Sequence, residues 1–279
     1  MISEVQKQKG FTLVELAIVL TIVGLLIGGI LKGQQLMQNS RVTATVAQVN
    51  SFEAATTSFR DAYGELPGDL FNSQTRISGC NSACNLAGGE TGNGKVGIID
   101  WDFKTFQSSP PTAGAFANLV SGETVLFWYH LQQAGLISAV TDEGITDDAT
   151  ATFDGTLPSA KIGGGFWVGN SSGIRAALLN DTDMGMPAGS SYTLLGTVLV
   201  MVSKPNPLVS FGATYTPKFT GLQPLTPAIA ANIDRKIDDG MPASGQVQAY
   251  GVETSCHDAA GYKEGVSAKD CGLIMLIQR

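Results

Sequence analysis

The stretch Lys9-Gly10-Phe11-Thr12-Leu13-Val14-Glu15 decides the fold of this 279-residue chain, because it opens a long apolar run that contains one carboxylate. Across residues 11–31, the only side chains that are neither apolar nor glycine belong to Thr12, Glu15 and Thr21. As a helix, these 21 residues would measure about 31 Å at 1.5 Å per residue, enough to span the hydrocarbon core of a bilayer. The sequence therefore predicts a membrane-spanning helix at residues 11–31.

Glu15 is a costly residue in such a helix. An ionised carboxylate in hydrocarbon costs about 3 kcal/mol or more, so its side chain should be paired, protonated or close to the interface. Lys7 and Lys9 precede the apolar run with only Glu4 opposing them, and the positive-inside rule places residues 1–10 in the cytoplasm. The part of the chain that follows the apolar run is therefore expected to be exported.

Two simpler interpretations compete for the apolar run. A cleaved secretory signal has an apolar region of about 7 to 15 residues that ends at small residues, whereas this run is longer and continues. An ordinary signal anchor fits the length and the flanking charge, but it gives no reason for Gly10-Phe11 followed by Glu15. Neither interpretation accounts for the arrangement of these three residues.

At these residues the chain resembles the type IV filament proteins, the family of type IV pilins and type II secretion pseudopilins. The resemblance rests on a short basic leader that ends in Gly10, on Phe11, on Glu15 four residues later and on the apolar helix. In that family a prepilin peptidase cleaves after the glycine and methylates the new amino group, which implies cleavage between Gly10 and Phe11 and methylation of Phe11. Glu15 matches the family's glutamate at the fifth mature position. It would neutralise the amino group of Phe11 on a neighbouring subunit, because two buried charges are tolerable when paired.

The resemblance implies a structural, non-enzymatic subunit of a filament, either a pilin or a pseudopilin. Its partners would be other copies or sister pilins, prepilin peptidase and an inner-membrane assembly platform. It would be stored in the bacterial inner membrane as a single-pass protein with a cytoplasmic N-terminus and a periplasmic head, and would then enter a periplasmic or cell-surface filament. A type IV pilus, a type II secretion system and a competence system all remain open, as do major and minor roles.

The helical pattern continues beyond the membrane segment. Mostly apolar side chains recur at spacings of three and four residues, which is one face of a helix, at Val42, Val46, Val49, Phe52, Thr56, Phe59 and Tyr63. Gly64 and Pro67 should end this helix. The chain is thus expected to consist of a leader at 1–10, a long helix at 11–62 and a globular head at 63–279.

The head is predicted to be α+β and pilin-like, with the amphipathic half of the long helix packed on an antiparallel sheet. One extra helix is expected at residues 122–134 with Ser121 as its cap. Another should follow Thr226, because Pro227 suits the first helical position and Gly240 can end the helix. Strands are expected at residues 165–168, 192–202, 246–253 and 273–277.

The composition favours an exported globular head that does not bind nucleic acid. Charged residues make up only 15% of the chain and hydrophobic residues 43%, which supplies ample apolar material for a core. Removal of residues 1–10 leaves 15 basic against 23 acidic side chains, a net charge of −8. Such an acidic head disfavours binding to nucleic acid.

Four cysteines fall in the part that is expected to be exported, where disulfides are permitted. They are Cys80, Cys84, Cys256 and Cys271. Three pairings are possible, and the local one is favoured. A bridge from Cys256 to Cys271 would resemble the disulfide-bounded region of many type IV pilins and contribute about 3 kcal/mol. A zinc site is disfavoured by the cysteine spacing and because the chain has only two histidines, His130 and His257.

Two glycine-rich motifs resemble catalytic loops. Residues 92–97 fit G-x-G-x-x-G, but Ile98-Ile99 after them reads as a strand, so a turn is predicted. Residues 169–173 fit the G-x-S-x-G elbow of serine hydrolases, with Ser171 as nucleophile and His257 as the available base. That match keeps a membrane-anchored periplasmic hydrolase, or a binding protein that uses the head, as the alternative function. A hairpin turn between Val168 and Ile174 is favoured, because no alternating series of strands and helices builds the sheet that an elbow requires.

Calcium is the one cofactor that the acidic loops suggest. Asp181-Thr182-Asp183 begins like a calcium loop, but Tyr192 stands where the bidentate glutamate belongs. Loop acids could still bind calcium in another manner, as in some pseudopilin heads; they are Asp181, Asp183, Asp238 and Asp239. Solvated loop acids without a metal are the favoured interpretation.

Overall fold

The computed structural model describes residues 12–84, 92–96, 98–99, 113–141, 151–172, 194–205, 223–251 and 255–279. The chain divides into two compact units, Met1–Arg41 and Val42–Arg279, which we call the N-terminal unit and the head unit. Helix α1 (Leu13–Tyr63) is continuous through the boundary between them. It ends one residue after the predicted position, and Gly64 follows with a φ of +76°, a conformation that glycine adopts readily.

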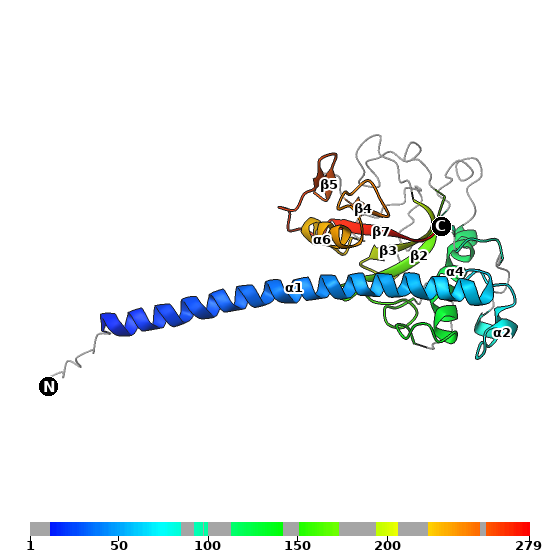
Figure 1. Cartoon of the computed structure of the whole chain (residues 1–279), viewed down its shortest axis with the longest axis horizontal. Coiled ribbons are helices and arrows are strands. Elements are labelled where there is room, and N and C mark those ends of the chain that lie inside the picture. Colours follow the sequence, from blue (N-terminus) through cyan, green and yellow to red (C-terminus); the bar gives the residue numbers. More distant parts are fainter. Residues whose placement is uncertain are drawn as a thin grey trace, which may run out of the picture. The chain divides into compact units, whose positions relative to one another are not determined.

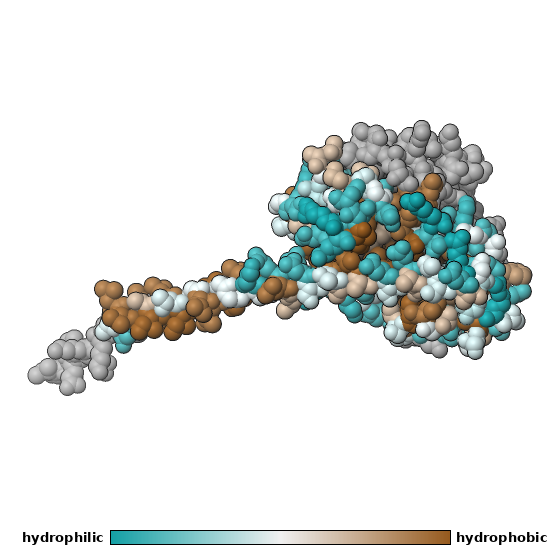
Figure 2. All heavy atoms as spheres, viewed as in Figure 1, coloured by the Kyte–Doolittle hydropathy of each residue, from teal (hydrophilic) through white to brown (hydrophobic). Residues whose placement is uncertain are grey.

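The N-terminal unit exposes its apolar side chains. Leu13 and Leu25 are 85% and 78% exposed, and Figure 2 shows apolar residues covering this stretch of α1. Within the described residues, α1 is the one helix that is long and apolar enough to cross a membrane. This segment therefore has an apolar surface that its own unit does not bury.

In the head unit, α1 buries the face that the sequence predicted, including Val42, Val49, Phe52 and Phe59. Phe52 lies edge-on against Trp128 of α4 (Ala113–Gln133) and against Phe166 of β2 (Gly165–Ser172). The ring centroids are 4.9 and 5.4 Å apart. Such aromatic pairs contribute about 0.5 to 1.5 kcal/mol each beyond their buried area, so Phe52 fixes α1 against both elements.

The sheet of the head unit confirms the predicted α+β class. Its order is β1-β2-β3-β7-β4, with β1 (Ile98–Ile99), β3 (Leu195–Val202), β7 (Cys271–Gln278) and β4 (Val247–Gly251) (Figure 1). The pairs β2–β3, β3–β7 and β7–β4 are antiparallel, and the short β1 pairs in parallel with β2. A separate ribbon joins β5 (His257–Asp258) to β6 (Gly261–Tyr262).

The extra helices agree with the sequence in part. Helix α6 (Pro227–Ile237) begins where Thr226 and Pro227 predicted, and two short helices, α2 (Ser73–Arg76) and η1 (Ser82–Cys84), were not foreseen. The prediction for α4 was wrong at its start, because the helix begins at Ala113 and passes through Ser121. Ser121 is therefore no cap.

The predicted hairpin turn after Val168 is wrong as well. Strand β2 continues to Ser172, and Gly169, Asn170 and Ser171 each pair with a residue of β3. Pairing with a long neighbouring strand outweighs the turn preference of glycine, asparagine and serine, because strand preferences depend strongly on context.

Candidate functional site

The start of α1 is closed by a reciprocal cap. The backbone N–H and the hydroxyl of Thr12 both donate to Oε2 of Glu15, at 2.9 and 2.8 Å, and the N–H of Glu15 donates to Oγ1 of Thr12 at 3.3 Å. This is the capping-box arrangement, in which the first and fourth residues satisfy each other's backbone donors. Glu15 therefore has a role within its own helix that the sequence analysis missed, although the pattern T-x-x-E could have indicated it.

The cap leaves part of the Glu15 carboxylate accessible to a partner. Both hydrogen bonds from Thr12 end on Oε2, and neither uses Oε1. The side chain also lies on the exposed surface of the N-terminal unit. Gly10 and Phe11, the residues of the expected cleavage site, lie outside the described residues.

All four cysteines form disulfides, and the pairs are the local ones, Cys80 with Cys84 and Cys256 with Cys271. Cys256 and Cys271 are fully buried in the main core of the head unit. Cys271 also exchanges two backbone hydrogen bonds with Leu225, of 2.9 and 3.0 Å, just before α6. The Cys256–Cys271 bridge therefore connects the start of β7 to the segment before β5. The hydrogen bonds with Leu225 also connect the start of β7 to the segment that leads into α6.

His130 joins three segments at the other end of the head unit. Its Nδ1 accepts a hydrogen bond from Gly68 N–H at 2.9 Å, and its Nε2 lies 3.0 Å from the carbonyl oxygen of Cys84. Because Nδ1 accepts, Nε2 carries the hydrogen and donates. Burial lowers the pKa of His130 to about 4, against the smaller opposing effect of the Cys84 carbonyl. The neutral ring therefore links α4 to the turn after α1 and to the Cys80–Cys84 loop.

The glycine motif at residues 92–97 forms a turn in its described part, as predicted, and an internal carboxylate occupies it. The N–H groups of Gly92, Asn93 and Gly94 donate to Asp69 at 2.6, 3.0 and 2.7 Å. Burial raises the pKa of Asp69, and these hydrogen bonds oppose that shift. Backbone N–H groups in such a turn can hold an anion, and here the chain supplies its own.

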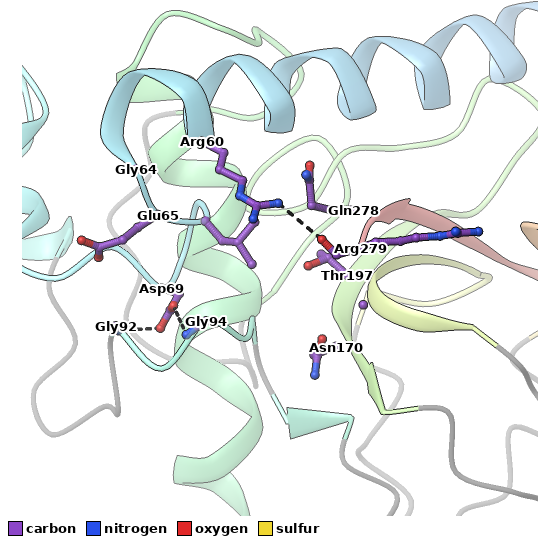
Figure 3. A pocket seen from close by; sticks show the side chains of 12 residues that line it. Arg60, Gly64, Glu65, Asp69, Gly92, Gly94, Asn170, Thr197, Gln278 and Arg279 are labelled. Atoms are coloured by element: carbon purple, nitrogen blue, oxygen red, sulfur yellow. Dashed lines mark hydrogen bonds between the residues drawn. The ribbon is translucent and has the colours of Figure 1, made fainter.

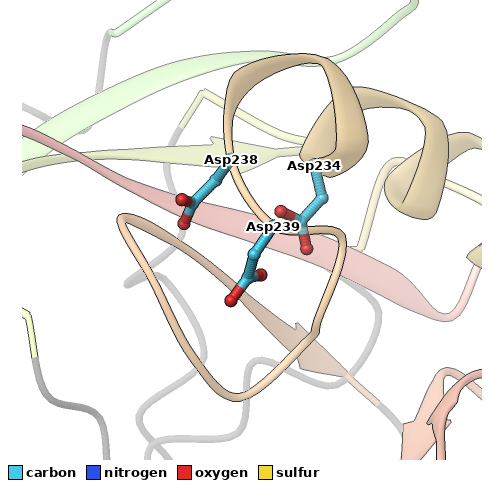
Figure 4. Close-up of side chains that lie close together, drawn as sticks. All are labelled: Asp234, Asp238 and Asp239. Carbon is cyan, nitrogen blue, oxygen red and sulfur yellow. The ribbon is translucent and has the colours of Figure 1, made fainter.

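Three aspartates gather at the end of α6, as Figure 4 shows: Asp234 in its last turn, and Asp238 and Asp239 just after it. Oxygens of Asp234, Asp238 and Asp239 lie within 4.8 Å of one another. All three already accept hydrogen bonds. Asp234 accepts from Tyr262 and Gly240, Asp238 accepts from Gln246 and Val247, and Asp239 accepts from Met241 and Ser244. Burial, reinforced by the two neighbouring carboxylates, raises the pKa of Asp234 to about 6.

This cluster therefore organises the loop between α6 and β4. Its oxygens are the ligand type that calcium prefers. The sequence analysis considered Asp238 and Asp239 but missed Asp234, which is fully buried. The other two acids considered for calcium, Asp181 and Asp183, lie outside the described residues.

The residues of the alternative hydrolase do not form a nucleophile elbow in the described part of the chain. Ser171 lies within β2, paired with Ile99 on one side and Gly196 on the other. An elbow would place the serine on a sharp turn from strand to helix. His257 is fully buried, burial lowers its pKa to about 4, and neither ring nitrogen has a hydrogen-bond partner among the described residues.

Comparison with known families supports the N-terminal site. Residues 5–31 match the family model of the prokaryotic N-terminal methylation motif. No curated protein and no solved structure matches the chain. The matched residues include Gly10, Phe11 and Glu15 and lead into the exposed apolar part of α1. This chain therefore carries the prepilin-type N-terminal signal that is the hallmark of type IV pilins and pseudopilins, on a pilin-like α+β fold.

Proposed function

We propose that the protein is a structural subunit, pilin or pseudopilin, of a type IV pilus or type II secretion-like filament. Prepilin peptidase cleaves it between Gly10 and Phe11 and methylates Phe11. The observation that carries this proposal is the methylation motif at residues 5–31, which runs directly into a helix whose apolar side chains stay exposed. Before assembly, that helix anchors the protein in the inner membrane with its head in the periplasm.

Glu15 sets the position of the subunit in the filament. Its Oε2 caps its own helix, and its Oε1 accepts from the ammonium group of Phe11 on a neighbouring copy or sister pilin. Two buried charges that are costly alone become tolerable as a pair, so the correct axial position is favoured over others. Other copies, prepilin peptidase and an inner-membrane assembly platform are the partners that this function requires.

Mass spectrometry of the mature N-terminus tests the processing step. In cells with active prepilin peptidase, we expect the protein to begin at a methylated Phe11. A Gly10→Val variant should keep residues 1–10 and serves as the control. An uncut Met1 terminus on the unaltered protein would contradict the proposal.

Two substitutions at Glu15 separate charge pairing from capping. Glu15→Val removes both functions, whereas Glu15→Gln removes the charge but keeps an acceptor for the cap, since glutamine also serves in capping boxes. We expect both variants to stay in the membrane and to be absent from sheared filaments. If Glu15→Gln entered filaments normally while Glu15→Val did not, the side chain would act as a cap and charge pairing would be refuted.

A further inference from the structure

The two disulfides of the head unit differ in how far solvent reaches them. Cys256 and Cys271 are both 0% exposed and belong to the main core. Cys84 is 1% exposed, but Cys80 is only partly buried, and the residues on either side of Cys80 are exposed. A thiol attacks a disulfide at a sulfur that it can reach. The Cys80–Cys84 bridge therefore offers a point of attack at Cys80, whereas the Cys256–Cys271 bridge is enclosed by the folded head unit.

Cys84 is held in place by contacts that do not involve the disulfide bond. Its carbonyl oxygen accepts a hydrogen bond from the hydroxyl of Ser73 at 2.6 Å and lies 3.0 Å from Nε2 of His130. Its side chain packs with Leu126 and Tyr129 of α4. The sulfur of Cys84 should therefore stay where it is when the bridge opens.

The next described part of the chain after Cys84 is also fixed independently of the bridge. The N–H groups of residues 92–94 donate to the carboxylate of Asp69 (Figure 3). Asp69 directly follows Gly68, whose N–H donates to His130 at 2.9 Å. The turn after α1 thus holds both His130 and residues 92–94, and opening the bridge should release neither of them.

The turn that carries Cys80 depends more on the bridge. Ile77, before this turn, is buried, whereas all of residues 78–82 except Cys80 are exposed. The N–H of Cys80 donates to the carbonyl oxygen of Ile77 at 3.2 Å, a hydrogen bond within the turn itself. The covalent bond to Cys84 therefore connects the middle of an exposed turn to the head unit, and its loss should loosen residues 78–82.

We propose that Cys80 is a site of thiol–disulfide exchange, through which dithiols open the Cys80–Cys84 bridge while the Cys256–Cys271 bridge stays closed. A thiolate of the dithiol attacks Sγ of Cys80, the S–S bond breaks, and its electron pair leaves on Sγ of Cys84, which takes up a proton. The second thiol of the reagent, as thiolate, then attacks the reagent's own sulfur in the mixed disulfide. Cys80 leaves as a thiolate and is protonated.

This exchange reduces the two cysteines by two electrons and oxidises the dithiol to a disulfide. Because Cys84 stays anchored, the same bond can form again when the solution becomes oxidising. The bridge is thus a redox-sensitive link between the exposed turn and the head unit. It concerns the head unit alone and is independent of the proposed filament role.

Timed reduction of the full-length protein in detergent tests the difference between the two bridges. The protein is treated with dithiothreitol without denaturant, and samples are then trapped with N-ethylmaleimide in denaturant and analysed by peptide mass spectrometry. We expect Cys80 and Cys84 to become labelled at least about ten-fold faster than Cys256 and Cys271. Equal rates, or faster labelling of Cys256 and Cys271, would overturn the proposal.

Two single substitutions test which sulfur is attacked. Cys84→Ser leaves the thiol of Cys80 and Cys80→Ser leaves the thiol of Cys84, so both variants lose the same bridge. We expect the Cys80 thiol to react with N-ethylmaleimide in the folded protein at least about ten-fold faster than the Cys84 thiol. Equal rates, or faster reaction of Cys84, would refute the assignment. If circular dichroism shows either variant to be unfolded, the timed reduction of the unaltered protein still decides the proposal.

Hydrogen exchange measures how far the loosening extends. After reduction of the Cys80–Cys84 bridge, the amide of Cys80 should exchange at least about ten-fold faster, while the amides of Gly68 and Gly92 should keep their rates. Faster exchange throughout α4 and β7 would show that the bridge supports the whole head unit, which would contradict a local link.

Discussion

The charge state of His130 affects the stability of the head unit. Its pKa is about 4 in the folded protein and about 6.5 when unfolded, so the unfolded chain binds one more proton between these values. The free energy of unfolding is therefore highest above pH 6.5 and falls as the pH drops toward 4. The shift corresponds to about 3 kcal/mol, because each pKa unit is 1.36 kcal/mol.

We predict that His130→Gln flattens this pH dependence. Urea unfolding at about pH 7.5, 5.5 and 4.5 should show a smaller loss of stability on acidification in the variant than in the unaltered protein. His257, whose pKa is also lowered, makes the free energy of unfolding fall on acidification in the same way. Asp234 acts in the opposite direction: because its pKa is raised to about 6, its contribution to the free energy of unfolding increases as the pH falls through that value. An identical slope in both proteins would contradict the assigned role of His130.

Single residues differ in how far the sequence could identify them. Gly10, Phe11 and Glu15 were recognisable because their motif is local. Asp69 and His130 were not. The hydrogen-bond partners of Asp69 lie 23 to 25 residues away in the chain, and those of His130 lie 46 and 62 residues away. A sequence reading without a fold has no means to bring such residues together.

At the scale of elements, helix α6 offers a clean test of a cap. The hydroxyl of Thr226 accepts from Ile229 N–H at 3.4 Å, and Pro227 follows at the first helical position. We predict that Thr226→Ala lowers the free energy of unfolding by about 1 kcal/mol, measured by urea denaturation. Thr226→Ser keeps the acceptor and should cost markedly less. Equal losses for both variants would show that the methyl group of Thr226 matters more than the cap.

The elements that the sequence predicted well carry their own signals, and the others depend on neighbours. The Thr226-Pro227 start of α6 is encoded locally. Helix α4 runs through Ser121-Gly122, and its residues 124–131 are buried in the head unit, a packing that outweighs local preferences. Strand β2 runs through Gly169 to Ser172 because β3 pairs with every residue of it.

The two disulfides should stabilise the head unit unequally. By loop entropy, closing the separation of 15 residues between Cys256 and Cys271 contributes about 3 kcal/mol, and the separation of 4 between Cys80 and Cys84 about 2 kcal/mol. We predict that replacing both Cys256 and Cys271 by alanine lowers the free energy of unfolding in urea more than replacing both Cys80 and Cys84. The reverse order would mean that the Cys80–Cys84 bridge acts mainly by holding the carbonyl of Cys84 on His130.

At the scale of the whole molecule, the buried apolar residues that the structure describes all belong to the head unit. Its buried apolar residues extend from Val42 to Ile277. We predict that a shortened chain of residues 42–279, made under oxidising conditions, folds without detergent. Circular dichroism should show cooperative unfolding, with a Tm within about 5 °C of that of the full-length protein. Non-cooperative unfolding would show that the N-terminal unit contributes to the stability of the head.

Helix α1 varies in its intrinsic stability along its length. Its 51 residues form one continuous ladder of backbone hydrogen bonds, at 1.5 Å of rise per residue. The least resistant stretch lies where four glycines, Gly24, Gly28, Gly29 and Gly33, each weaken the helix by about 1 kcal/mol and contact no neighbouring side chain. The helix is therefore intrinsically least stable between residues 24 and 33, within the N-terminal unit.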